Sequence, residues 1–121
     1  MEDDRSKIHH SDLVIDEVRE NPPGRDDRHL DQEYVAFKND GTDAVEISGW
    51  SVEDEAGNTF RFPEDTVLKS GDRITLHSSR GENTESDVYW GADRPVWSNA
   101  GDTILVRDAD GVVRIRESYN E

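Results

Sequence analysis

Cysteine is absent from this chain of 121 residues. Without cysteine, the protein has no disulfide framework, no thiolate metal site and no cysteine nucleophile. It also has no apolar run near the roughly 18 residues that a membrane helix needs. The N-terminal stretch MEDDRSKIHHSD lacks the apolar centre of a signal peptide. We therefore expect a cytoplasmic protein without membrane insertion, or an extracellular one if this chain is a piece of a larger secreted protein.

Lysine is scarce, with 3 Lys and 11 Arg against 17 Asp and 12 Glu, for a net charge of −15. An Asp-rich, Lys-poor chain is typical of salt-accumulating halophiles, because at about 1 M salt the Debye length falls to roughly 3 Å and self-repulsion is screened. The composition predicts a haloarchaeal type of protein whose stability rises with salt. The alternatives are an ordinary acidic domain and a domain that docks on a basic partner.

The same charge weighs against a broad electrostatic grip on nucleic acid, which needs clustered Lys and Arg. One modest basic group stands near the C-terminus, at Arg107, Arg114 and Arg116. Arg114 and Arg116 share one face of a predicted strand, so we interpret the group as a solvated sheet face.

No helical pattern of three turns is present, and apolar and polar residues instead alternate in short runs, as in half-buried strands. Turn signals such as Asn21–Gly24 and Asp108–Gly111 separate the runs, and the Asp-Gly pair in the second is a strong hairpin signal. The sequence predicts an all-β, antiparallel sandwich or barrel of about eight or nine strands. The predicted strands cover Leu13–Val18 (bulged near Glu17), Glu33–Lys38, Val45–Val52, Thr59–Pro63, Arg73–Ser78, Val88–Gly91, Thr103–Arg107 and Val112–Arg116.

The stretch Val45–Val52 (VEISGWSV) is the one around which we expect the other strands to be arranged. Gly49 interrupts its alternation, which predicts a bulge or bend that swings the indole of Trp50 over the apolar face. A tryptophan covers more apolar area than any other side chain, so Trp50 is predicted to be the centre of the core. The full predicted core is Ile15, Val35, Phe37, Ile47, Trp50, Phe60, Phe62, Ile74, Leu76 and Leu105.

The polar segments suggest one folded domain over residues 12–121, preceded by a disordered acidic tail over residues 1–11. His9 and His10 lie in that tail, and Asp26, Asp27, His29 and Asp31 lie in a charged loop. The aspartates of this loop lack the spacing of an EF-hand loop, and so does the DADG turn at Asp108–Gly111. We expect no metal and no cofactor. Residues 79–86 (SRGENTES) form a long polar loop, a kind of segment that is often mobile.

Several short motifs occur together in one order: EYVAFKN (Glu33–Asn39), ISGW (Ile47–Trp50) and WSNAGD (Trp97–Asp102). With LVIDEV, TFRFP, LKSGD and RDADG, they make the chain resemble the lamin tail domain family over about Leu13–Tyr119. The resemblance implies an immunoglobulin-like β-sandwich and a non-catalytic role. Prokaryotic members often accompany nucleases, phosphoesterases or DNA-uptake (competence-type) proteins, which would make this chain a tethering module.

Tyr89, Trp90, Arg94 and Trp97 form a candidate recognition patch, and the alternative is that their rings pack the end of the sandwich. The leading hypothesis is a module that binds a protein partner through a strand edge or the end loops, with a monomer favoured. A second hypothesis is nucleic-acid or polysaccharide binding through the aromatic and Arg patch. An enzyme such as a metal-dependent hydrolase is the weakest hypothesis, because no G-x-S-x-G or H-E-x-x-H motif occurs and no catalytic residue can be named.

Overall fold

The computed structural model describes residues 13–19, 33–92, 96–97 and 102–119. Over these residues the chain contains strands and turns and no helix, as the sequence predicts. The strands are β1 (Leu13–Arg19), β2 (Tyr34–Asn39), β3 (Val45–Glu46), β4 (Ser51–Glu53), β5 (Thr59–Arg61), β6 (Val67–Leu68), β7 (Arg73–His77), β8 (Asp87–Tyr89), β9 (Asp102–Arg107) and β10 (Val113–Tyr119).

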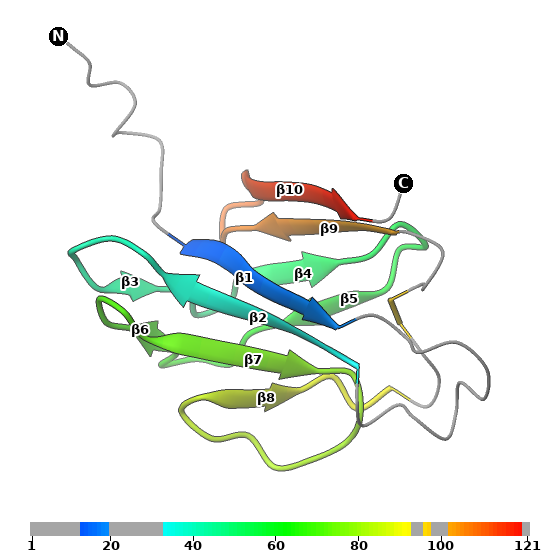
Figure 1. Cartoon of the computed structure of the whole chain (residues 1–121), viewed down its shortest axis with the longest axis horizontal. Coiled ribbons are helices and arrows are strands. Elements are labelled where there is room, and N and C mark those ends of the chain that lie inside the picture. Colours follow the sequence, from blue (N-terminus) through cyan, green and yellow to red (C-terminus); the bar gives the residue numbers. More distant parts are fainter. Residues whose placement is uncertain (1–12, 20–32, 93–95, 98–101, 120–121) are drawn as a thin grey trace, which may run out of the picture.

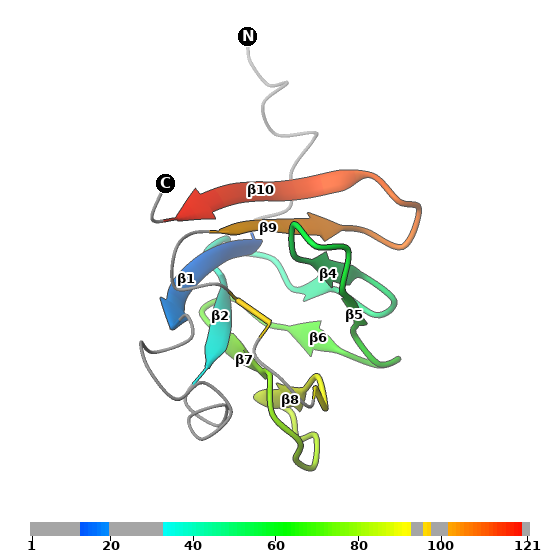
Figure 2. The same ribbon diagram turned by 90° about the vertical axis from the view of Figure 1, so that its right-hand side faces the viewer.

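Two four-stranded sheets face each other in Figures 1 and 2 and enclose one apolar core. The first sheet, sheet A, has the order β1-β2-β7-β8, and the second, sheet C, has the order β10-β9-β4-β5. A small ribbon of β3 and β6 joins them. The predicted all-β sandwich is therefore confirmed. One pair departs from the antiparallel prediction, because β8 runs parallel to β7.

The stretch Val45–Val52 does not form one bulged strand. Its first part, β3, pairs with β6, and its last part, β4, pairs with β5 and β9 in sheet C. Between them the amide of Trp50 donates to the carbonyl of Ile47 (3.0 Å), which makes a turn. Gly49 has φ +76°, a left-handed conformation that suits glycine. This division, together with the pairing of Val67–Leu68, raises the number of described strands to ten.

Two local predictions are confirmed: the bulge in the first strand and the hairpin turn at Asp108–Gly111. The β1 ladder shifts register between Ile15 and Glu17. At Asp108–Gly111, the amide of Gly111 donates to the carbonyl of Asp108 (2.9 Å) and closes the turn between β9 and β10. Hydrogen bonds from the Val112 amide and the Arg114 side chain hold the pKa of Asp108 below its usual range. Its oxygens are thus occupied by the protein itself.

Most of the predicted core lies between the sheets. The buried members are Val35, Phe37, Ile47, Trp50, Phe60, Phe62, Ile74 and Leu76, while Ile15 is partly buried and packs against them. Leu105 was predicted wrongly, because the inward residues of β9 are its neighbours Ile104 and Val106. Leu105 lies half-buried on the outer face of sheet C.

Trp50 is not the centre of the core. It is 8 % exposed, and the Arg114 guanidinium lies 5.8 Å from its ring centroid. The least exposed rings are instead those of Phe37, Trp97 and Phe62, at 0–2 %. Ring contacts run from Phe37 to Phe62 (6.0 Å), from Phe62 to Phe60 (5.4 Å) and outward from Phe60 to the half-buried Trp90 (5.9 Å). Because the charged guanidinium of Arg114 lies over the indole, Trp50 stands at the rim of the core.

Candidate functional site

The predicted recognition patch divides between the core and the surface. Trp97 is 0 % exposed, and its ring meets that of Trp90 edge to face, 5.9 Å away. Trp97 therefore packs the end of the sandwich, and its assignment to a recognition patch is wrong. Trp90 is half-buried, and so is Tyr89. Arg94 lies outside the described residues. Of the described members of the patch, the structure brings Trp90 and Trp97 together and leaves only Tyr89 and Trp90 within reach of a ligand.

Tyr89 belongs to an aromatic row on the outer face of sheet A. Tyr34, His77 and Tyr89 are register partners across β2, β7 and β8. The imidazole of His77 stacks on the Tyr89 ring, with the ring centroids 4.6 Å apart and 14° between the planes. The Tyr34 ring is tilted against the same imidazole, with the centroids 6.1 Å apart. A Cβ atom at Gly81 would lie 2.5 Å from the Tyr89 ring, so the loop before β8 touches that ring closely. Two neighbours therefore hold Tyr89 in one orientation.

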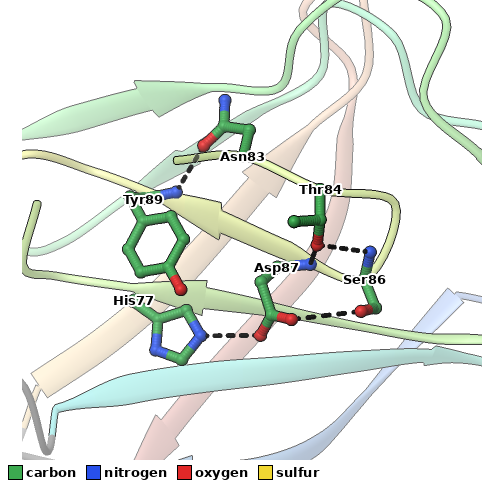
Figure 3. Close-up of polar contacts among 6 residues, drawn as sticks. All are labelled: His77, Asn83, Thr84, Ser86, Asp87 and Tyr89. Atoms are coloured by element: carbon green, nitrogen blue, oxygen red, sulfur yellow. Dashed lines mark hydrogen bonds and ion pairs between the residues drawn. The ribbon is translucent and has the colours of Figure 1, made fainter. Parts of the chain in front are cut away.

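Hydrogen bonds tie the polar loop over residues 79–86 to β8 (Figure 3). His77 Nε2 and Asp87 Oδ1 are 2.8 Å apart, and the other Asp87 oxygen accepts from the Ser86 hydroxyl at 3.1 Å. Thr84 Oγ1 accepts from the amide of Asp87, and Asn83 Oδ1 accepts from the amide of Tyr89. The bond from His77 lowers the pKa of Asp87. The loop is thus organised by its own side chains.

This cluster does not have the geometry of a nucleophilic triad. A catalytic serine donates to an imidazole that is itself held by a carboxylate. Here Ser86 donates to Asp87, and in the described part of the chain no serine hydroxyl bonds the imidazole of His77. Among the described residues, no group of three His, Asp or Glu side chains is arranged to hold a metal ion. The other predicted ligand candidates, His9, His10, Asp26, Asp27, His29 and Asp31, lie outside the described residues.

A buried carboxyl group at Glu33 holds the segment that carries Trp97. Glu33 is 0 % exposed just before β2, and its Oε1 accepts from the Val96 amide at 2.8 Å. Within the described part of the chain, Glu33 Oε2, Ser78 Oγ and Trp97 Nε1 are buried without a hydrogen-bond partner. Burial raises the pKa of Glu33, and the nearby Ser78 hydroxyl and the Val96 amide oppose the rise. The sequence motif contains Glu33 but gives no sign of its burial.

The variant Glu33→Gln is expected to change how stability depends on pH. A carboxyl group whose pKa is raised in the folded protein stabilises the fold below its unfolded pKa of 4.5, and this stability is lost as pH rises through the folded pKa. Gln keeps the acceptor for the Val96 amide and carries no charge. Its stability relative to the native protein should therefore increase between pH 4 and pH 7, by about 1.4 kcal/mol for each unit of pKa shift.

Urea unfolding at several pH values measures this difference. Glu117→Gln, at an exposed position of β10, gives the effect of removing one negative charge from the surface. A Glu33→Gln difference that is constant with pH would show that Glu33 is not desolvated.

The structure also buries two polar residues, Asn39 and Asp102, whose burial the sequence analysis did not predict. Asn39 is 0 % exposed, and its side chain bonds Asp43, Leu68 and Gly41. Asp102 is 6 % exposed and accepts from the amide of Glu55 at 3.0 Å. Asn39 ends the motif EYVAFKN and Asp102 ends the motif WSNAGD. These motif positions were the only sign in the sequence that the two side chains have a special role. Their motif positions therefore have structural explanations.

Comparison with known proteins agrees with this architecture. A search of curated proteins finds no match. The family model described as "Lamin Tail Domain" matches residues 7–121, nearly the full length of the chain. The match covers both sheets, the β3–β6 ribbon and the aromatic end of the sandwich. With its all-β immunoglobulin-like fold, the chain belongs to the lamin tail domain family.

Proposed function

We propose that this chain is a non-catalytic module that binds a protein partner and tethers it within a larger assembly. The observation that carries the proposal is membership of an immunoglobulin-like interaction family over residues 7–121. The site geometry supports it, because the described His and Ser side chains near β8 form no nucleophile–base pair. Sandwich domains of this kind present strand edges and end loops to their partners.

The alternative, nucleic-acid or polysaccharide binding, is weakened by the position of Trp97. Stacking on a base or sugar needs an accessible ring face, and Trp97 is 0 % exposed. Tyr89 has one face covered by His77. The net charge of −15 also opposes phosphate binding. Protein binding is therefore the better supported function.

We also propose a haloarchaeal type of protein from a salt-rich cytoplasm, in a system linked to a nuclease or to DNA uptake. The charge of −15 supports the first point, and the association of prokaryotic lamin tail domains with such systems supports the second. The melting temperature should rise between about 0.1 and 2 M KCl, because added salt screens the self-repulsion of the acidic surface. A constant melting temperature would contradict the halophilic origin.

Partner binding in the same salt series tests the function. The full chain serves as bait in extracts of the source cells, and each captured protein is produced separately and titrated by calorimetry. Docking through apolar contacts should persist or tighten as KCl rises, because such salt does not weaken apolar burial. A mixed-sequence oligonucleotide and an oligosaccharide serve as competing probes. Binding of the oligonucleotide with an affinity that falls linearly with log salt would overturn the proposal.

A further inference from the structure

The outer edge of β10 is the longest regular strand edge among the described residues. The order of the two sheets leaves β1, β8, β10 and β5 at the edges. β5 and β8 have only 3 residues each, and the register shift between Ile15 and Glu17 interrupts β1 near its middle. In β10 the register shift lies near the start, between Val113 and Ile115. From Ile115 to Tyr119 the strand pairs with β9 without interruption, and no described strand pairs with its other side.

The outer face beside this edge forms a shallow concavity. Arg116 of β10, Leu105 of β9 and Glu53 of β4 are register partners, so they form one row across sheet C. These three residues line a concavity of about 390 Å³ together with Asp54, Glu55 and Thr103. The half-buried Leu105 supplies its apolar surface. A side chain from an added strand next to Arg116 would therefore lie close to this concavity.

Of the residues that the structure describes, Arg116 is the one cationic residue that lines the concavity. The three carboxylates accept hydrogen bonds inside the protein: Glu53 from Arg107, Asp54 from Asn58 and Glu55 from Thr103. Arg116 has neither a hydrogen bond nor an ion pair among the described residues. An uncommitted guanidinium is a strong, directional partner for a carboxylate.

Apolar side chains at the start of the same edge are also exposed. Val112 is 54 % exposed and Val113 is 40 % exposed. Long edge strands are normally protected against unwanted pairing, and here the protection is directed against a second copy of the chain. The antiparallel register that pairs all of residues 115–119 with themselves sets Glu117 opposite Glu117, and the register shifted toward the start of the strand sets Arg116 opposite Arg116. Like charges in such positions are destabilising, so these two registers of self-pairing are opposed.

We propose that the outer edge of β10 accepts an extended segment of a partner protein by strand addition, and that an acidic residue of this segment pairs with Arg116. The inference rests on the proposed function and names the surface and the chemistry of the partner. Main-chain hydrogen bonds to β10 supply the affinity. The carboxylate at Arg116 and apolar residues over Val113 supply the specificity.

A synthetic peptide of the length of β10, 7 residues, with alternating valine and glutamate, serves as the probe. At about 0.5 M KCl, where long-range repulsion is screened, backbone amide NMR signals of β10 and β9 should shift on titration. A peptide with proline at its centre has lost a main-chain donor and should bind at least tenfold more weakly. The valine–lysine peptide keeps the main-chain hydrogen bonds but places a like charge at Arg116, so it should bind at least tenfold more weakly than the valine–glutamate peptide.

Arg116→Glu should weaken the valine–glutamate peptide by about tenfold, because it removes a charge-assisted pair and adds repulsion. It should also make the valine–lysine peptide bind more tightly. Arg61→Glu makes the same charge change on β5, at the far edge of the same face, and should leave the affinity within about twofold. Arg116→Gln provides a second variant without charge reversal.

Absence of amide shifts at about 2 mM peptide, or shifts confined to β1, β5 or β8, would overturn the inference. So would equal effects of Arg116→Glu and Arg61→Glu. A captured partner whose affinity is insensitive to Arg116→Glu and Arg116→Gln would also overturn it while leaving the proposed function intact. Failure of the proposed function itself would instead appear as salt-sensitive oligonucleotide binding.

Discussion

Replacing Trp97 by alanine is expected to lower the free energy of unfolding by about 3–5 kcal/mol. The indole is 0 % exposed and packs edge to face on Trp90. Removal of so large a buried side chain loses its apolar transfer energy and leaves a cavity that the two sheets fill only in part. Native domains are stable by only about 5–15 kcal/mol, so this is a large share of the total. Urea unfolding followed by far-ultraviolet circular dichroism measures it.

Trp90→Ala is the matched control for this prediction. Trp90 is half-buried and belongs to the same aromatic chain. Less apolar surface is withdrawn from water at this position, so the loss of stability should be clearly smaller than at Trp97. If Trp97→Ala were as stable as the native protein and had lost a ligand instead, the indole would belong to a recognition patch after all.

The contrast between Trp50 and Trp97 shows what strand periodicity can and cannot predict. Trp50 stands next to a regular alternation, so the sequence places it on a known face and its burial is predictable. Trp97 lies between segments with no period, and its neighbour Val96 is bound through its amide by Glu33, which is remote in sequence. A contact between residues 33 and 96 has no local signal. The sequence therefore could not show that Trp97 is buried while Tyr89 and Trp90 are only half-buried.

Leu105 illustrates a second limit, which is the phase of a strand. In TILVR either Ile104 and Val106 or Thr103, Leu105 and Arg107 can face inward, because alternation fixes two faces and does not name the inner one. The polar Thr103 and Arg107 share the face of Leu105, and this was evidence for the outer face. The same residue now lies in the concavity beside Arg116, so the correction also locates the proposed docking surface.

The division of Val45–Val52 between two ladders has a different cause. Gly49 signals an interruption, and the sequence predicts it correctly. Whether the chain then continues in one sheet or moves to another depends on which partners the two halves find. β3 has only the two residues of β6 as a partner, and β4 has both β5 and β9. Pairing of this kind is a property of the assembled sandwich and has no local pattern.

The variant Asn39→Ala is expected to destabilise the fold by about 2–4 kcal/mol, although it removes only a small polar side chain. Asn39 Nδ2 donates to the carbonyls of Leu68 and Asp43, both at 2.8 Å, and its Oδ1 accepts from the amide of Gly41 at 3.0 Å. These bonds fasten the turn after β2 to the end of β6. A buried polar group left without its partner costs about 1–3 kcal/mol.

Asn39→Asp separates loss of these bonds from loss of packing, because aspartate has the size of asparagine. Its second oxygen would face the carbonyls of Leu68 and Asp43 and would repel both, so this variant should also be destabilised. Asn58→Ala is the control for the substitution itself, because Asn58 is exposed and its side chain bonds only Asp54. That control should lose no more than about 1 kcal/mol. If Asn39→Asp had native stability in chemical unfolding, the two donor bonds would not hold the turn, and β6 would be fixed by its pairing with β3 and by the burial of Leu68.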